Sequence, residues 1–345
     1  MKKKFISQYL LITFLGSLSS LSLPPLNFYI INFFTFSIFF RFLYKKLNKK
    51  IDRKIFFFYG WGFGFGYFLT NLYWITISLT FDKNFSFLIP IALVLIPSFL
   101  ALFYGLISLF FCIFNPKNIL SAFFSFSLFF GIIEFFRSIV LTGFPWNLIV
   151  YSFSKNLNFI SILSILGTYS LNLIVISFFT APAVYILRKS KKEIALCIFL
   201  ILLPIIFFAH GNFQKNLFLD EDLKKLPYSI RVVGSNIPLS RFYDNTQTEN
   251  VINDLISISS PVLNKKIFFI WPEGIIPNTY RDEMYLYNDI FSKNFNENHI
   301  IGLGVTHREI KNNQYKFYNS FSIYDSELNL INDYNKINLV PFGEF

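Results

Sequence analysis

The sequence predicts a polytopic α-helical membrane domain, residues 1–210, followed by an α/β domain, residues 211–345. Two observations predict this division. The chain is 54% hydrophobic and only 15% charged, with a mean hydropathy of +0.49, which is too apolar for an ordinary soluble domain. The apolar runs end near residue 209, and short β-rich segments separated by polar helices follow them.

Seven apolar runs are long enough to cross a bilayer, for which about 20 helical residues are needed. They lie near residues 5–22, 26–43, 55–79, 87–114, 119–140, 159–187 and 193–209. The first run also fits a cleaved signal peptide, because three lysines precede it and Ser17 and Ser19 are small. Cleavage would leave the orientation of the later spans unchanged.

Basic residues orient these spans. Residues 1–210 contain 18 Lys and Arg against four Asp and Glu, and 14 of the cations fall on one side of an alternating seven-span topology. Lys and Arg accumulate in cytoplasmic loops, so an odd number of spans exports residues 211–345 to the periplasmic side of a bacterial inner membrane. The exported domain has 13 basic against 16 acidic residues, a balance that argues against nucleic-acid binding.

The exported domain alternates strands and helices. A helix is expected between the first two strands, where Val251, Ile252, Leu255 and Ile258 have helical spacing and predict an apolar face that packs on a sheet. The predicted strands are Ser229–Gly234, Lys266–Trp271, Ile300–Val305 and Lys316–Tyr324.

Two motifs in this domain carry candidate catalytic residues. The segment FFIWPEG ends an apolar strand with Pro272 and the carboxylate of Glu273. Strand ends carry catalytic groups in α/β domains, although a single acid after a strand is more often a surface turn. The segment NKINLVPFGEF places Lys336 and Glu344 on either side of an apolar, turn-prone LVPFG. Taken alone, Lys336 fits a solvated loop lysine as well as a functional group.

Together, the two motifs resemble the nitrilase superfamily and, within it, the apolipoprotein N-acyltransferases. Upstream segments resemble the same family: GWGFGFGYFLTNLYWI at Gly60–Ile75, then Glu134 and Arg137 ahead of LTGFPWNL at Leu141–Leu148. The resemblance implies that residues 211–345 are the N-terminal part of a nitrilase-type domain, an α-β-β-α sandwich. We therefore expect an incomplete domain in a C-terminally truncated chain.

The resemblance implies transfer of a fatty acyl chain from a membrane phospholipid to the N-terminal amine of an apolipoprotein's diacylglyceryl-cysteine, through a thioester on an enzyme cysteine. The family's Glu and Lys correspond to Glu273 and Lys336. A desolvated carboxylate accepts the thiol proton, and a fixed ammonium stabilises the oxyanion. The family's cysteine follows the LVPFGE motif and has no counterpart here, because Cys112 and Cys197 lie in apolar runs. We expect the chain alone to be inactive.

Four further residues are supporting candidates. Glu344 matches another functional glutamate of the family, and Tyr243 stands near the position of a family Trp, where it would contact the acyl chain. Phe144 and Trp146 are candidates for a lateral lipid entrance at the exported side, where amphipathic aromatic residues settle at headgroup level. A plain aromatic anchor explains this pair equally well.

The remaining polar residues of interest point to structure. Glu134 and Arg137 are three residues apart in an apolar run and can pair on one helix face. The histidines His210, His299 and His307 show no metal-ligand spacing, so neither a metal nor a cofactor is expected. We expect a monomer.

Two other functions compete with acyl transfer. An amide hydrolase of the wider nitrilase superfamily would use the same Glu and Lys, but seven spans and the TGFPWN segment argue against it. A degenerate remnant or lipid-binding membrane protein would explain the missing nucleophile, since half a sandwich leaves sheet edges and apolar faces uncovered.

Overall fold

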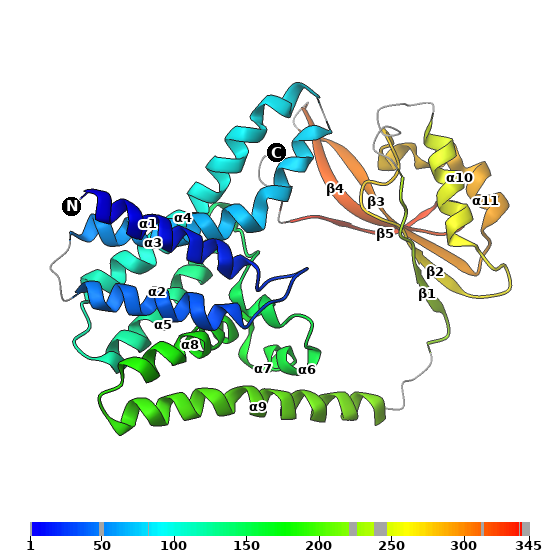
Figure 1. Ribbon diagram of the computed structural model, residues 1–345. Coiled ribbons are helices and arrows are strands. Elements are labelled where there is room, and N and C mark those ends of the chain that lie inside the picture. The colour runs from blue at the N-terminus through cyan, green and yellow to red at the C-terminus, as the bar shows by residue number, and fades with distance from the viewer. Residues whose placement is uncertain are drawn as a thin grey trace. The chain divides into compact units, whose positions relative to one another are not determined.

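The computed structural model describes residues 2–47, 52–81, 83–220, 226–237, 247–311, 314–337 and 339. The chain forms two compact units, Met1–Asp222 and Leu223–Phe345, shown in Figure 1. We call them the helical unit and the sheet unit.

Helices account for nearly all of the helical unit, and each of the seven predicted apolar runs contains at least one. The long helices are α1 (Lys2–Ser20), α2 (Ile31–Leu47), α3 (Arg53–Leu72), α4 (Ile89–Phe114), α5 (Ile119–Arg137), α8 (Thr168–Leu187) and α9 (Lys191–Asp220). The short elements are η1 (Tyr73–Thr80), η2 (Lys83–Leu88), η3 (Val140–Thr142), η4 (Ile149–Phe153), α6 (Leu157–Ile160) and α7 (Leu163–Leu166).

Four helical segments of the described residues are long and apolar enough to cross a membrane. They are Lys83–Phe114, Ile119–Arg137, Thr168–Leu187 and Lys191–Asp220. Helix α2 has only 17 residues, and Lys, Ser, Gly and Tyr lower the hydropathy of α1 and α3. The helical unit therefore fits a membrane protein, and the count of seven spans stays a prediction.

Several predicted spans differ from the helices observed. In the run at residues 55–79, α3 ends at Leu72 and the 3₁₀ helix η1 follows. The run at residues 159–187 is interrupted, because Gly167 adopts a φ of +74° between α7 and α8. That left-handed conformation ends a helix and suits glycine. The last run continues as helix to Asp220, past its predicted end at residue 209.

Glycines let α3 pack closely against two neighbouring helices. A Cβ atom at Gly66 would lie 2.0 Å from the backbone oxygen of Thr13 in α1. One at Gly60 would lie 2.2 Å from the backbone oxygen of Tyr104 in α4. Because both partner atoms are backbone, no side-chain movement could relieve these contacts. The GWGFGFG segment thus provides small-residue contacts of the kind that membrane helices use to approach each other.

The sheet unit contains a five-stranded sheet in the order β1-β2-β3-β4-β5. The strands are β1 (Ser229–Val232), β2 (Ile267–Ile270), β3 (His299–Lys311), β4 (Gln314–Tyr324) and β5 (Leu330–Asn335). The first three are parallel to one another, and β4 and β5 continue the sheet in antiparallel pairs. The first four overlap the predicted strands, although β3 continues to Lys311, past its predicted end at Val305. β5 is absent from the predicted set because its sequence, LINDYN, is mostly polar.

Helices α10 (Thr248–Ser259) and α11 (Asn288–Asn294) lie on one face of this sheet (Figure 1). Val251, Ile252 and Leu255 of α10 are buried, as the periodicity predicts. The prediction was wrong for Ile258, which is 48% exposed, while Ile256 is buried in its place. The buried stripe of α10 is centred between Ile252 and Leu255, so Ile258 falls beyond its edge.

The opposite face of the sheet carries apolar side chains that the described residues leave uncovered. Ile230, Val232 and Ile300 alternate with the residues that face the helices, and all three are exposed. An apolar sheet face is unfavourable in water, so such a face usually packs against another layer of structure.

Candidate active site

The structure brings together the side chains of Glu273 and Lys336, which are 63 residues apart in the chain. Glu273 follows β2 and Lys336 directly follows β5. The Lys336 ammonium lies 3.4 Å from Oε1 of Glu273. The backbone N–H of Lys336 also donates to the carbonyl of Asn319 on β4, at 2.8 Å. The sheet topology therefore delivers the acid and the lysine to one place, while their catalytic role stays a prediction.

Asn319 is a third member of this site that the motifs did not indicate. Its side-chain amide donates a hydrogen bond to Oε1 of Glu273, the same oxygen that Lys336 contacts. One carboxylate oxygen thus receives a neutral and a charged donor. The available signal in the sequence was a polar residue within the apolar strand segment KFYNSFSIY.

Glycine 304 permits the close approach of β3 to the acid. A Cβ atom at Gly304 would lie 2.6 Å from the Cα of Glu273 and 3.0 Å from the backbone N of Gly274. Gly274 itself has a φ of +58°, so the chain turns sharply after the acid. These two glycines fix the backbone that presents the carboxylate.

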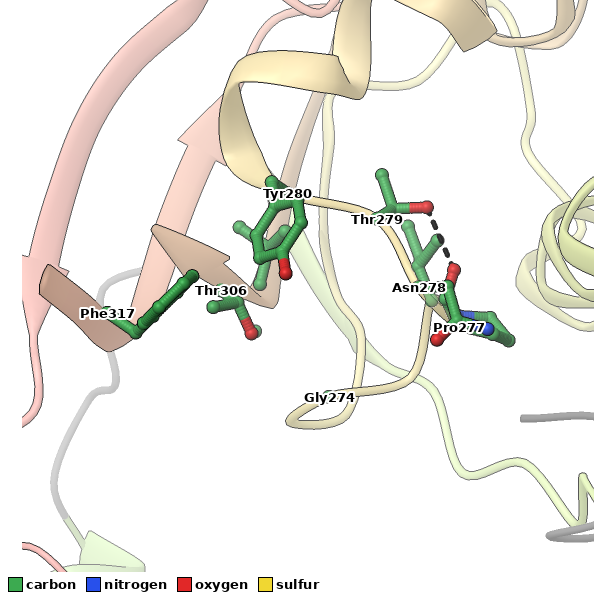
Figure 2. Close-up of a pocket in the computed structure, with 10 residues that line it drawn as sticks. Gly274, Pro277, Asn278, Thr279, Tyr280, Thr306 and Phe317 are labelled. Atoms are coloured by element: carbon green, nitrogen blue, oxygen red, sulfur yellow. Dashed lines mark hydrogen bonds between the residues drawn. The ribbon is translucent and has the colours of Figure 1, made fainter. Parts of the chain in front are cut away.

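Two adjoining hollows open beside the acid. One, of about 380 Å³, is lined by Glu273, Thr306, Tyr318, Asn319 and Leu339, among others. The other, of about 540 Å³, lies along the 274–280 loop (Figure 2). There Thr279 donates to the carbonyl of Pro277 at 2.9 Å, while Tyr280, Thr306 and Phe317 gather on the strand side.

The acid and lysine are open to solvent within the described residues. The Glu273 side chain is 63% exposed and that of Lys336 is 33% exposed. The described residues therefore do not provide the desolvation expected around the carboxylate. Exclusion of water from this pair requires additional structure over the site.

Ion pairs tie the segment after the loop to the sheet. Arg281 contacts Asp333 of β5 at 2.5 Å. Arg308 of β3 contacts Asp282 at 2.7 Å and Glu283 at 2.8 Å. Ion pairs near the surface contribute little one by one, but together these connect the turn Arg281–Tyr287 to two strands.

Two of the histidines have partners within the fold. His299 is buried, which lowers its pKa, and its Nδ1 accepts from the backbone N of Asn296 at 3.2 Å while Nε2 lies 3.2 Å from the carbonyl of Val262. Nε2 of His307 lies 2.7 Å from the guanidinium of Arg281, which can only donate. Both rings therefore hold together segments of the sheet unit.

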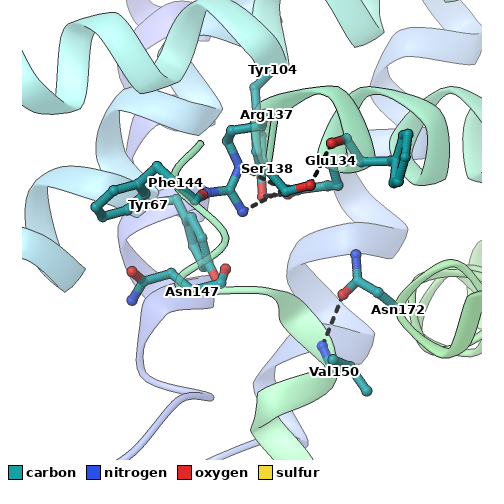
Figure 3. A network of polar contacts seen from close by, with 10 residues as sticks. Tyr67, Tyr104, Glu134, Arg137, Ser138, Phe144, Asn147, Val150 and Asn172 are labelled. Carbon is teal, nitrogen blue, oxygen red and sulfur yellow. Dashed lines mark hydrogen bonds and ion pairs between the residues drawn. The ribbon is translucent and has the colours of Figure 1, made fainter. Parts of the chain in front are cut away.

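In the helical unit, Glu134 and Arg137 form a buried ion pair, with side chains 1% and 0% exposed. Their closest atoms are 2.5 Å apart, and the hydroxyl of Tyr104 donates to Glu134 at 2.8 Å. Figure 3 shows that Arg137 also reaches the following loop, donating to the carbonyl of Phe144. The pairing predicted from the sequence is present, and it anchors the segment that carries the aromatic candidates.

The loop after α5 presents Trp146 at the surface. Trp146 is exposed and stacks on Trp74 of η1 with ring centroids 5.7 Å apart, and Phe144 lies beside it at 5.5 Å. The hydroxyl of Tyr67 donates to the carbonyl of Asn147 at 2.8 Å, which gives the loop a second anchor (Figure 3). A role for Phe144 and Trp146 as a lipid entrance stays a prediction.

Comparison with known proteins finds similar sequences that extend over both units. Residues 15–181 match the model of the apolipoprotein N-acyltransferase N-terminal domain. The apolipoprotein N-acyltransferase of Rickettsia prowazekii is 31% identical over 347 residues, covering 96% of this chain. That of Allorhizobium ampelinum is 29% identical over 345 residues, also covering 96%. The chain is similar to apolipoprotein N-acyltransferases over almost its whole length.

The chain spans only part of the length of these relatives. It covers 65% of the Rickettsia acyltransferase and 63% of the Allorhizobium one. A third apolipoprotein N-acyltransferase, from Brucella melitensis, is 27% identical over 294 residues, which are 83% of this chain and 54% of the relative.

Two of the residues assigned through resemblance to the acyltransferases lie outside the described residues. They are Tyr243 and Glu344. Both stay predictions, as does the placement of the acyl chain and of the nucleophile relative to Glu273.

Proposed function

We propose that this chain supplies the membrane anchor, the acid and the lysine of a site that transfers an acyl chain from a membrane phospholipid to the N-terminal diacylglyceryl-cysteine of an apolipoprotein. The observation that carries the proposal is the 3.4 Å contact between Lys336 and Glu273. The two residues follow different strands, β5 and β2. Similarity to the apolipoprotein N-acyltransferases supports the choice of substrates.

Glu273 accepts the proton of the attacking thiol, which makes the sulfur nucleophilic. The sulfur adds to the ester carbonyl of the phospholipid, and Lys336 stabilises the oxyanion until the glycerol oxygen leaves and takes up a proton. The amine of the apolipoprotein then attacks the thioester, forming the amide and returning the thiol. Asn319, which donates to the same oxygen as Lys336, directs the other carboxylate oxygen of Glu273 to the thiol.

The thiol does not come from residues 223–345, because they contain no cysteine. Cys112 lies in α4 and Cys197 in α9, and both are in the helical unit. We infer that the nucleophile belongs to polypeptide outside these residues, encoded downstream or separately. The same polypeptide would form the second sheet of an α-β-β-α sandwich on the uncovered face marked by Ile230, Val232 and Ile300, on the periplasmic side of the inner membrane.

The test uses the gene read through to its own stop codon in a bacterium depleted of its resident apolipoprotein N-acyltransferase. Mass spectrometry of a reporter lipoprotein should show a third acyl chain, on the N-terminal amine. Release of free fatty acid or ammonia without this product would contradict the proposal and favour a hydrolase. The 345-residue chain alone should carry no hydroxylamine-sensitive acyl group, and an acyl thioester on Cys112 or Cys197 would contradict the assignment of the nucleophile.

Gly304→Ala should reduce acyl transfer by this gene product about 100-fold, because the added Cβ would push the backbone of Glu273 away from its position. Initial rates of reporter acylation measure the effect. Gly234→Ala is the matched control, since a Cβ there meets nothing within 4 Å, and it should retain full activity. Equal rates for the two variants would show that the approach of β3 to the acid has no role in the reaction.

A further inference from the structure

All residues that line a cavity of about 370 Å³ belong to the helical unit. The cavity is formed where the start of α2, the segment from η4 to α6, and helices α8 and α9 meet. This size is within the range of small-molecule pockets, which are mostly apolar and carry a few placed polar groups. Nothing in the proposed acyl transfer uses it.

Aromatic rings make up most of the cavity wall. Phe153 stacks on Phe159 with ring centroids 4.2 Å apart, and Phe33 meets Phe178 edge to face at 4.9 Å. Pro204 of α9 adds a further apolar surface. This part of the wall favours contact with hydrocarbon.

Several polar groups line the same cavity, among them Lys155, Ser152 and Asn27. Lys155 is exposed and forms no ion pair with any described residue. The hydroxyl of Ser152 is buried, with the residue only 2% exposed, and it has no hydrogen-bond partner among the described residues. Oδ1 of Asn27 is likewise buried and unpartnered within the described ranges. Buried polar atoms are nearly always satisfied, so two such atoms at one cavity indicate a missing partner.

We propose that this cavity binds one bilayer phospholipid as a fixed component of the helical unit, distinct from any lipid consumed as acyl donor. The upper part of an acyl chain lies against the phenylalanine rings, and the phosphate pairs with Lys155. The hydroxyl of Ser152 donates to a glycerol ester oxygen or to the phosphate, and Oδ1 of Asn27 accepts from a headgroup ammonium or hydroxyl. A phospholipid presents an anion, ester acceptors, a headgroup donor and hydrocarbon together, which matches the groups at the cavity.

The experiment uses the full gene product in phosphatidylethanolamine vesicles that contain a phosphatidylglycerol analogue with a photoreactive diazirine near the glycerol end of one acyl chain. Irradiation and peptide mass spectrometry should place the label on peptides containing Asn27–Phe33 and Ser152–Phe159. Lys155→Glu should reduce this labelling about fivefold or more, whereas Lys155→Arg should retain it. Lys83→Glu, at another exposed lysine outside the cavity, is the matched control and should leave the labelling unchanged.

The variants should unfold at the wild-type temperature in detergent, which separates loss of the lipid from loss of the fold. Equal labelling in Lys155→Glu and wild type, or label spread evenly over the lipid-facing helices, would overturn the proposal. Excess inorganic phosphate should not displace the label, and displacement would show that the site takes a free anion. Reporter acylation by Lys155→Glu should proceed at the wild-type rate, so failure here is independent of the acyl-transfer proposal.

Discussion

Glu273→Gln should abolish N-acylation of the reporter lipoprotein by the full gene product, reducing the rate about 10²–10⁴-fold. The amide keeps the size of the carboxylate and can still accept from Asn319 and Lys336, but it cannot take up the thiol proton. Lys336→Met should reduce the rate about 10²–10³-fold, because a hydrophobic side chain leaves the oxyanion without its donor. Trapping of the thioester with hydroxylamine should fail in the Gln variant.

Two exposed residues provide matched controls for these changes. Glu327→Gln and Lys266→Met make the same chemical replacements away from the acid and lysine, and both should retain wild-type rates. The double variant Glu273→Gln/Lys336→Met should be little worse than the more damaged single variant, because residues that act as one unit are not additive. Multiplication of the two losses would indicate that the acid and the lysine act in separate steps.

The sequence predicted those features that depend on hydrophobic pattern and on specific motifs. Four strands and α10 follow from apolar alternation and helical spacing, and the pairing of Glu134 with Arg137 follows from their spacing of three in an apolar helix. The site features that the sequence did not predict depend on how strands pair in the folded sheet. The polar strand β5 exists because it pairs with β4, and that pairing brings Lys336 to the acid.

Other differences also have local physical causes. Asn319 looked like a polar interruption of a strand, and only the three-dimensional register shows that its amide faces Glu273. The exposure of Ile258 depends on where the helix meets the sheet, which periodicity over three turns does not specify. The exposure of Glu273 depends on which segments surround it in three dimensions, and the spacing of residues within the motif does not specify this.

Arg137→Met should destabilise the helical unit by about 3–5 kcal/mol, because the change removes one partner of a buried ion pair and leaves the Glu134 carboxylate without its cation. The variant also loses the donor to the carbonyl of Phe144, so the loop that carries Trp146 loses an anchor. Thermal unfolding in detergent measures the stability, and quenching of tryptophan fluorescence by a water-soluble quencher reports on the loop.

The double variant Glu134→Gln/Arg137→Met separates two contributions to stability. One is the stabilisation by the ion pair itself, and the other is the cost of leaving a buried carboxylate unpaired. A neutral Gln can still accept from Tyr104 at the site where Glu134 now accepts at 2.8 Å, so the double variant should recover part of the stability lost by Arg137→Met. Arg188→Met, at an exposed arginine, is the control and should be close to neutral. If both variants at this pair were as stable as wild type, the pair would contribute nothing to folding, and its burial would have to serve the loop and its aromatic residues instead.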